Sequence, residues 1–228
     1  MAQSWAGLLF AHWRVPAHLL RPLIPAALEL DTCKGEAWLG IVPFYMRDVH
    51  PRATINVPGL SAFPELNVRT YVTRDNKPGV WFFSLDAGSR VAVNLARRLF
   101  YLPYFKAKMS SINEDEWVHY HSARTDSRTA SAAFEARYRP ISPVYFAEAG
   151  SLDHWLTERY CLYSVDKKGR LYRGEIQHAP WSLQRAEAKI SQNTMAEGLG
   201  IPLPEEQPLL HYVERLDVIT WYLERLSA

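Results

Sequence analysis

Three polar side chains alternate with apolar ones in the stretch FPELNVRTYVTR, at residues 63–74. Successive side chains of a strand point to opposite faces, so Glu65, Asn67 and Arg69 share one face, and the leucine and valines between them form the other. Phe63 and Tyr71 stand at the two ends of this polar row. An acid, an amide and a guanidinium in a row form either a solvated outer face or the polar wall of a ligand pocket. The stretch alone leaves both interpretations open, because charged side chains are rarely buried unless they are paired.

A second group of reactive side chains follows Pro103. On a strand predicted at residues 104–112, Tyr104, Lys106 and Lys108 point to one face, and neighbours in this set lie roughly 6–7 Å apart. When two ammonium groups lie so near each other in a dry pocket, each lowers the pKa of the other. The neutral amine that this favours is a nucleophile toward carbonyl compounds. The alternative is an exposed strand face that carries solvated lysines.

His119 and His121 also share one face of a predicted strand and could supply two metal ligands. No nearby cysteine or carboxylate completes a ligand set at a recognisable spacing, and the other histidines match no zinc-protease pattern. The sequence contains no nucleophile elbow, phosphate-binding loop or dinucleotide-binding fingerprint. We therefore predict neither a metal nor a cofactor.

Composition narrows the class of protein further. The 228 residues carry a net charge of +2, and their basic residues form no stripe of the kind that nucleic acid requires. Cys33 and Cys161 are too few for a disulfide framework. His12 and Arg14 interrupt the apolar run near the N-terminus, so neither a signal peptide nor a membrane span is predicted. We expect a soluble, cytoplasmic protein without a nucleic-acid or membrane partner. Its many aromatic residues favour an aromatic-lined cavity or a homo-oligomer interface.

About ten or more short strands must position these side chains. Strands are predicted at residues 8–15, 27–34, 36–47, 63–74, 80–85, 104–112, 117–124, 130–139, 160–165, 171–178 and 209–226, whereas 182–190 is ambiguous between helix and strand. Short helices are predicted after Pro16, after Ser89 and at residues 152–158, with a helical turn at 194–199.

Prolines and glycines mark the connections between these elements. Asn76-Lys77-Pro78-Gly79 predicts a turn, Pro43 predicts a sheet edge or a bulge, and His50 to Ala62 reads as a loop. Many short strands with regularly spaced turns indicate a single mainly antiparallel β (α+β) domain over residues 1–228. Its sheets are expected to close or pack together to hide their edges.

Three stretches together resemble a known family: FPELNVRTYV at 63–72, LARRLFYLPYFKAKM at 95–109, and LTERYCLY with IQHAPWSL at 156–163 and 176–183. The opening FAHWRVPAHLLRPLIP fits the same pattern. The sequence is similar to the YqjF-like family, a domain of unknown function in the acetoacetate decarboxylase-like superfamily, along nearly its whole length. The resemblance implies a cone-shaped, largely antiparallel β barrel with a few short helices and an internal cavity.

The resemblance also implies site residues. The decarboxylases of this superfamily use a Schiff-base lysine after a Gly-x-Pro, a glutamate on a central strand and an arginine near the N-terminal strand. Glu65 corresponds to that glutamate and Arg14 to that arginine, whereas Tyr104 stands at the position of the catalytic lysine. The chain therefore departs from the decarboxylase pattern at the nucleophile. Lys106 lies two residues after Tyr104, on the same face of the predicted strand.

Three functions follow from these residues. The leading hypothesis is a barrel that binds a small organic carboxylate or carbonyl compound without a Schiff base. Arg69 or Arg14 would hold the anionic end, and Glu65, Asn67, Tyr71 and Tyr104 would supply polar contacts. The second is a lyase (decarboxylase, aldolase or dehydratase) with Lys106 as the imine-forming nucleophile and Glu65 as the acid and base. The third is a non-enzymatic interaction or scaffold protein.

Overall fold

The strand that carries the polar row, β4 (Phe63–Arg74), is buried along both of its faces. Leu66 and Val68 are fully buried on one face, and Glu65 and Arg69 are 3% and 8% exposed on the other. A sheet with one face in water would expose every second residue of such a strand. The wall that contains β4 therefore has other parts of the chain packed against both sides.

The computed structural model describes residues 1–50 and 62–227. Most of the loop predicted between His50 and Ala62, at residues 51–61, lies outside the described residues. No helix in the described ranges has the length and apolar character that crossing a membrane requires.

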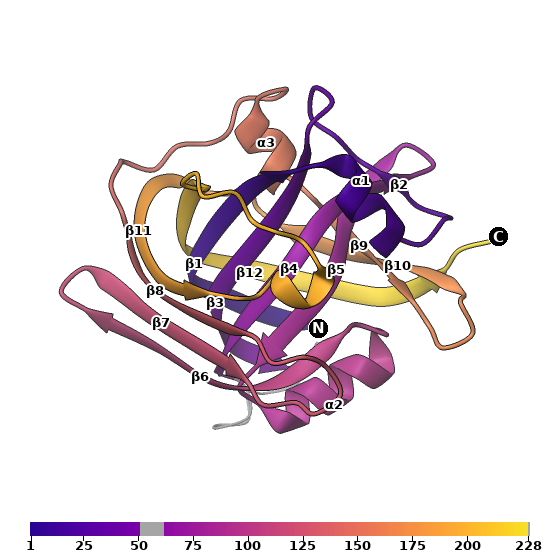
Figure 1. Ribbon diagram of the computed structural model, residues 1–228, viewed down its shortest axis with the longest axis horizontal. Helices are drawn as coiled ribbons and strands as arrows, with labels where there is room; N and C mark the ends of the chain where they lie inside the picture. The colour runs from indigo at the N-terminus through magenta and orange to yellow at the C-terminus, as the bar shows by residue number, and fades with distance from the viewer. Residues whose placement is uncertain (51–61, 228) are drawn as a thin grey trace.

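Strands make up most of the described chain (Figure 1). They are β1 (Ala2–Val15), β2 (Glu29–Leu30), β3 (Ala37–His50), β4, β5 (Lys77–Ala87), β6 (Tyr104–Glu114), β7 (Trp117–Arg124), β8 (Ala133–Pro140), β9 (Cys161–Val165), β10 (Leu171–His178), β11 (Gln184–Asn193) and β12 (Leu209–Arg225). The helices are α1 (Ala17–Leu20), α2 (Arg90–Leu99) and α3 (Leu152–Thr157), with the 3-10 turns η1 (Arg21–Leu23) and η2 (Glu197–Leu199).

The twelve strands form one mixed, mostly antiparallel sheet that closes on itself twice. One ring of hydrogen-bonded strands runs β5-β4-β3-β1-β12-β10-β9 and back to β5. A second ring shares the wall from β5 to β12 and closes through β11, β8, β7 and β6. Closure hides the strand edges, as expected for short antiparallel strands. The predicted mainly antiparallel β barrel with a few short helices is confirmed.

Two strands make both closures possible because each has two partners along a single edge. β5 pairs with β9 at Val80–Trp81 and with β6 at Leu85–Ala87. β12 pairs with β11 near His211 and with β10 from Val218 onward. The two groups of bridging strands therefore leave the shared wall on opposite faces, and each encloses its own interior.

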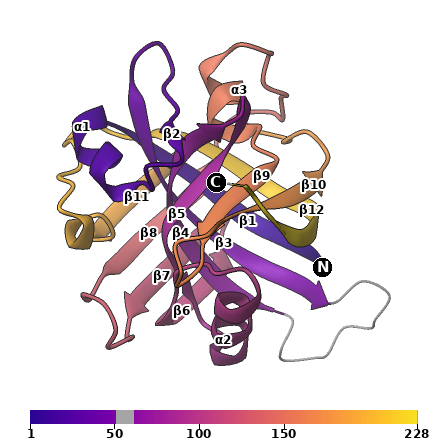
Figure 2. The same ribbon diagram turned by 90° about the vertical axis from the view of Figure 1, so that its right-hand side faces the viewer.

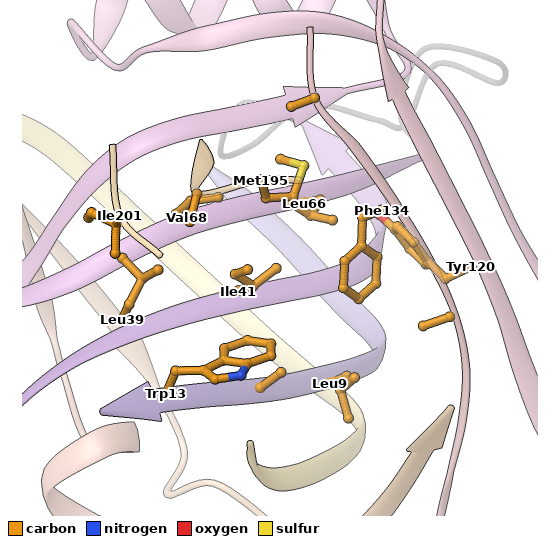
Figure 3. Close-up of a cluster of buried hydrophobic side chains, with 14 of the residues drawn as sticks. Leu9, Trp13, Leu39, Ile41, Leu66, Val68, Tyr120, Phe134, Met195 and Ile201 are labelled. Carbon is orange, nitrogen blue, oxygen red and sulfur yellow. The ribbon is translucent and has the colours of Figure 1, made fainter. Parts of the chain in front are cut away.

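One interior is a dry core. Leu66 and Val68 of β4 meet Leu9 and Ile41 of the shared wall and Phe134 of β8 across the ring (Figure 3). Packing of this kind removes apolar surface from water and stabilises folding by about 25 cal/mol per Å². Tyr120 is buried in the same cluster and directs its hydroxyl to the backbone of the shared wall.

The other interior holds the opposite face of β4. Aromatic and aliphatic side chains from β1, β3 and β5 surround it. The helices α2 and α3 lie at opposite ends of the molecule in both views (Figures 1 and 2). This interior contains the polar row.

Local details differ from the sequence-based predictions at several positions. The ambiguous stretch at 182–190 is strand β11, and the strand expected at 27–34 is reduced to the two residues of β2. The turn between β4 and β5 is Asp75-Asn76, both with positive φ, as two-residue hairpin turns require. Gly79 is therefore a strand residue. Pro43 lies where β1 and β3 shift register between Ala6 and Ala11, as the predicted bulge requires.

Gly79 permits the close approach of β5 and β9. A Cβ built there would lie 2.7 Å from Cys161 Sγ and 2.8 Å from the Cys161 carbonyl oxygen. We expect Gly79→Ala to lower the free energy of unfolding by about 1–3 kcal/mol or more, because backbone cannot move aside as a side chain can. Urea denaturation measures this change.

Gly198→Ala is the matched control, since its Cβ would meet its nearest neighbour, Ala130, at 3.6 Å. Equal stability of the two alanine variants would contradict the packing role of Gly79.

Candidate functional site

The polar row of β4 lines a cavity inside the first ring. Glu65, Asn67 and Arg69 are 3%, 5% and 8% exposed and all border it. The cavity has a volume of about 110 Å³. A single water needs only about 10–15 Å³, so the space is large enough for a small organic molecule.

Apolar side chains form most of the remaining cavity wall. Phe44 and Phe82 come from β3 and β5, and Phe100 and Leu102 come from the segment that follows α2. At the other end lie Thr157, the last residue of α3, and Arg159, two residues further along the chain. An apolar wall with a few convergent polar groups is the usual construction of a small-molecule site.

Glu65 is held at one end of the row by two tyrosines. The Tyr104 hydroxyl donates to Glu65 Oε2 at 3.0 Å, and the Tyr120 hydroxyl donates to the Glu65 carbonyl oxygen at 2.6 Å. Burial raises the pKa of the Glu65 carboxyl to about 8, against the opposing effect of the Tyr104 hydrogen bond. The carboxyl is therefore mainly protonated at neutral pH and can donate a hydrogen bond.

Arg69 lies at the other end of the row. Its guanidinium carbon is 5.1 Å from the centre of the Phe10 ring and 5.8 Å from that of Tyr71. Its Nε and Nη2 are buried and have no hydrogen-bond partner within the described residues. The buried guanidinium of Arg124, by contrast, is paired with Asp86 at 2.8 Å. Unpaired buried charge is unfavourable, so the Arg69 end of the cavity favours an anion.

Tyr71 and His12, which pack beside Arg69, are both neutral. The Tyr71 hydroxyl lies 2.6 Å from His12 Nε2, and both residues are fully buried. Burial lowers the pKa of His12 well below its ordinary value, and the charge of Arg69 lowers it further. Burial also raises the pKa of Tyr71. Neither side chain offers Arg69 a negative charge at neutral pH.

Arg159 is a cavity residue that the sequence did not indicate. It is 4% exposed and stacks 4.5 Å from the Trp155 ring and 5.0 Å from the Tyr71 ring. Nη1 donates to Asp31 at 2.6 Å and Nε to the Trp155 carbonyl oxygen, whereas Nη2 is buried without a partner in the described chain. Arg159 follows a short helix outside any strand alternation, so no periodicity marks it.

Two predicted site residues do not reach the cavity. Arg14 lies near the end of β1, its side chain is 62% exposed, and it forms an ion pair with Glu36 at 3.2 Å. Lys106 borders a separate outer groove with Pro64 and Thr125. Tyr104 pairs with Leu85 and borders the cavity, whereas Lys106 pairs with Ala87, the last residue of β5, and borders the outer groove instead.

Of the remaining predicted residues, some border the cavity and one lies just outside it. Tyr71 contacts the Arg69 end from behind and does not border the cavity, whereas Tyr104 and Asn67 do. The Asn67 Oδ1 is buried without a partner among the residues described. Residues 1–50 and 62–227 contain no group of three or more His, Cys, Asp or Glu side chains that could hold a metal ion.

Comparison with known proteins gives a sequence family. The model of the DUF2071 family, described as an uncharacterized conserved protein, matches residues 2–217. The uncharacterized protein YqjF of Bacillus subtilis (strain 168) is 50% identical over 227 residues, which cover 100% of this chain and 93% of that protein.

Solved structures match the fold at low sequence identity. The enduracididine biosynthesis enzyme MppR matches with a TM-score of 0.70 and 12% identity, covering 99% of this chain and 87% of that one. Another MppR structure contains pyruvate and matches with a TM-score of 0.67 and 13% identity, over 99% of this chain and 90% of that one. The acetoacetate decarboxylase of Legionella pneumophila matches with a TM-score of 0.64 and 10% identity, over 100% and 88%. The fold is therefore acetoacetate decarboxylase-like.

The raised pKa of Glu65 makes stability depend on pH. The ordinary carboxyl pKa is 4.5 and the folded value is about 8, so between these values the folded state keeps a proton that the unfolded state releases. This stabilisation is complete below pH 4.5 and is lost as the pH rises toward 8, by roughly 1 kcal/mol for each unit. We expect Glu65→Gln to remove this decline while keeping the Tyr104 hydrogen bond.

Urea denaturation at a series of pH values measures the decline, and Glu36→Gln, at the surface, serves as the control. Parallel pH profiles for wild type and Glu65→Gln would contradict a protonated Glu65.

Proposed function

This chain belongs to the DUF2071 family, and we propose that it binds a small organic carboxylate in the cavity beside β4. The ligand carboxylate contacts Arg69 and Arg159, and the rest of the ligand packs against the apolar wall. The observation that carries this proposal is the set of buried guanidinium nitrogens without acceptors: Arg69 Nε and Nη2, and Arg159 Nη2.

The charges at the Arg69 end of the cavity support an anionic ligand. Asp31 neutralises Arg159 at 2.6 Å, whereas Arg69 has no comparable carboxylate among the described residues. Glu65 adds no negative charge at neutral pH, because its pKa is about 8. The charge of Arg69 thus has no compensating carboxylate among the described residues, and in a buried site a charge-assisted hydrogen bond to a ligand carboxylate is strong.

The structural relatives are consistent with this ligand class. MppR, which shares the fold, has been solved with pyruvate and with a condensation product of pyruvate. Pyruvate is a small organic carboxylate. At 12–13% identity the match concerns the fold, so it adds plausibility to the ligand class and does not assign any residue.

The alternative of an imine-forming lyase stays a prediction without support from the geometry. Lys106 borders the outer groove, and the described side chains around the cavity include no lysine. The interaction or scaffold role also stays a prediction. The unpaired guanidinium nitrogens favour ligand binding over both.

Calorimetry with a panel of small oxo acids, aliphatic acids and aromatic acids tests the proposal. We expect at least one carboxylate to bind, and Arg69→Gln and Arg159→Gln each to weaken it roughly tenfold to hundredfold, since a hydrogen bond to a charged group contributes about 1.5–3 kcal/mol. Arg14→Gln, whose side chain is 62% exposed, is the matched control and should bind as wild type does.

A structural role of Arg69 gives a different result. Replacing an unpaired buried cation by a neutral amide should leave the stability to urea unchanged or raised, in spite of the lost ring contacts. Reduced stability together with unchanged affinity would assign Arg69 to the fold. A folded wild-type protein that binds no member of the panel would end the proposal.

A further inference from the structure

An irregularity in β5 determines which apolar side chain lies beside Arg69. β4 and β5 pair in one continuous register as far as Val68, which lies opposite Ser84. The next residue, Arg69, lies opposite Phe82, so Phe83 is an extra residue in β5 and forms a β-bulge. Residues directly opposite each other on paired strands lie on the same face of the sheet. Phe82 is therefore the direct neighbour of Arg69 on the cavity face.

The bulge assigns the two consecutive phenylalanines to different interiors. Phe82 borders the cavity, whereas Phe83 packs against the dry core. A regular continuation of the preceding register would place Phe83 opposite Arg69 and turn Phe82 to the dry side. β-Bulges beside functional sites commonly re-aim one side chain in this way. The fold therefore presents one particular ring at the end of the cavity that favours an anion.

Other rings near Arg69 are already packed against one another. Phe10, which lies 5.1 Å from the Arg69 guanidinium carbon, is 4.9 Å from Trp181. Trp181 in turn stacks on Trp5 at 5.9 Å. Within residues 1–50 and 62–227, no pair of packed rings includes Phe82. Its half-buried ring can therefore pack against a ring of a ligand.

The polar row is one strand wide, and apolar side chains lie on both sides of it. Asn67, in the middle of the row, lies opposite Val42 of β3 and Leu85 of β5, and all three border the cavity. At the Arg69 end, Phe82 flanks the row in the same way. A ligand whose carboxylate contacts Arg69 therefore packs its other atoms against apolar surface, and Phe82 supplies an aromatic ring to that surface.

The volume of the cavity limits the size of the apolar part of the ligand. The cavity measures about 110 Å³. An engineered apolar cavity of roughly 150 Å³ in another protein binds one benzene molecule. A single ring is therefore of the right size, whereas a system of fused rings exceeds the space.

We propose that the site selects carboxylates that carry one aromatic ring, and that Phe82 packs against this ring. This inference rests on the proposed carboxylate binding and adds to it the class of ligand and the residue that determines specificity.

Calorimetry with benzoate and phenylacetate, and with their saturated counterparts cyclohexanecarboxylate and cyclohexylacetate, tests the preference for an aromatic ring. Acetate and pyruvate serve as acids without a ring. We expect at least one aromatic acid to bind about two- to tenfold tighter than its saturated counterpart, because a pair of packed aromatic rings contributes this much beyond the burial of apolar area. The same aromatic acid should bind about tenfold or more tighter than acetate, because it buries more apolar surface.

Two leucine variants locate the source of the preference. Phe82→Leu should reduce the ratio of the two affinities, aromatic acid to saturated counterpart, to about one. Phe83→Leu, on the dry side of the same bulge, is the matched control and should keep the wild-type ratio. The ratio compares two ligands on one folded protein, so a loss of stability does not change it. If Phe82→Leu does not fold, Phe82→Met takes its place.

The two proposals fail in different ways. Binding that depends on Arg69 but favours the saturated acids or pyruvate would overturn the aromatic preference and keep the proposed function. An unchanged ratio after the loss of the Phe82 ring would overturn the role of this residue. Absence of binding by every acid in the series would remove both proposals.

Discussion

The shared wall of five strands is the constraint on which the molecule depends. Because the sheet closes on both sides of β5-β4-β3-β1-β12, each of these strands must fit two interiors at once. The alternation of β4 meets this requirement with aliphatic side chains on the dry side and the polar row on the cavity side. A shift of one residue in its register would place Glu65 in the dry core and Leu66 in the cavity, so register is strongly specified here.

Burial on both sides also accounts for the chemistry of the site. Glu65 keeps its proton because burial disfavours the charged carboxylate, and no described side chain on the cavity side offers an acceptor to Arg69 Nε or Nη2. Tyr120 connects the two interiors, since its ring packs in the dry core and its hydroxyl bonds the Glu65 carbonyl oxygen. The cavity is therefore an open space supported by a packed core, a usual way to hold polar groups in fixed positions.

The sequence predicts the strands and their faces better than their positions in the barrel. Alternation correctly separates Glu65 from Leu66, but it does not reveal what covers each face, because that depends on strands far away in the chain. Lys106 and Arg14 alternate in phase with Tyr104 and His12, yet each lies near the end of its pairing with a neighbouring strand, and neither borders the cavity. The face to which a side chain points can be predicted from the local sequence. Where that side chain lies along the barrel depends on which strands pair with its own.

Two further positions show where local patterns mislead. Gly79 follows Asn, Lys and Pro and reads as a turn, but its missing side chain serves the contact with Cys161. Arg159 carries no periodic signal, since it enters the cavity from an irregular segment after α3. Features that depend on close approach or on irregular backbone require coordinates.

The pairing of β1 with β12 has a consequence for how the molecule forms. Ala2 lies opposite Ile219, so the shared wall joins segments more than two hundred residues apart in the chain. Neither ring can close until β12 has been synthesised, and contacts of such high sequence separation slow folding. During translation the earlier strands must wait with unpaired edges, the condition in which β proteins aggregate or need chaperones.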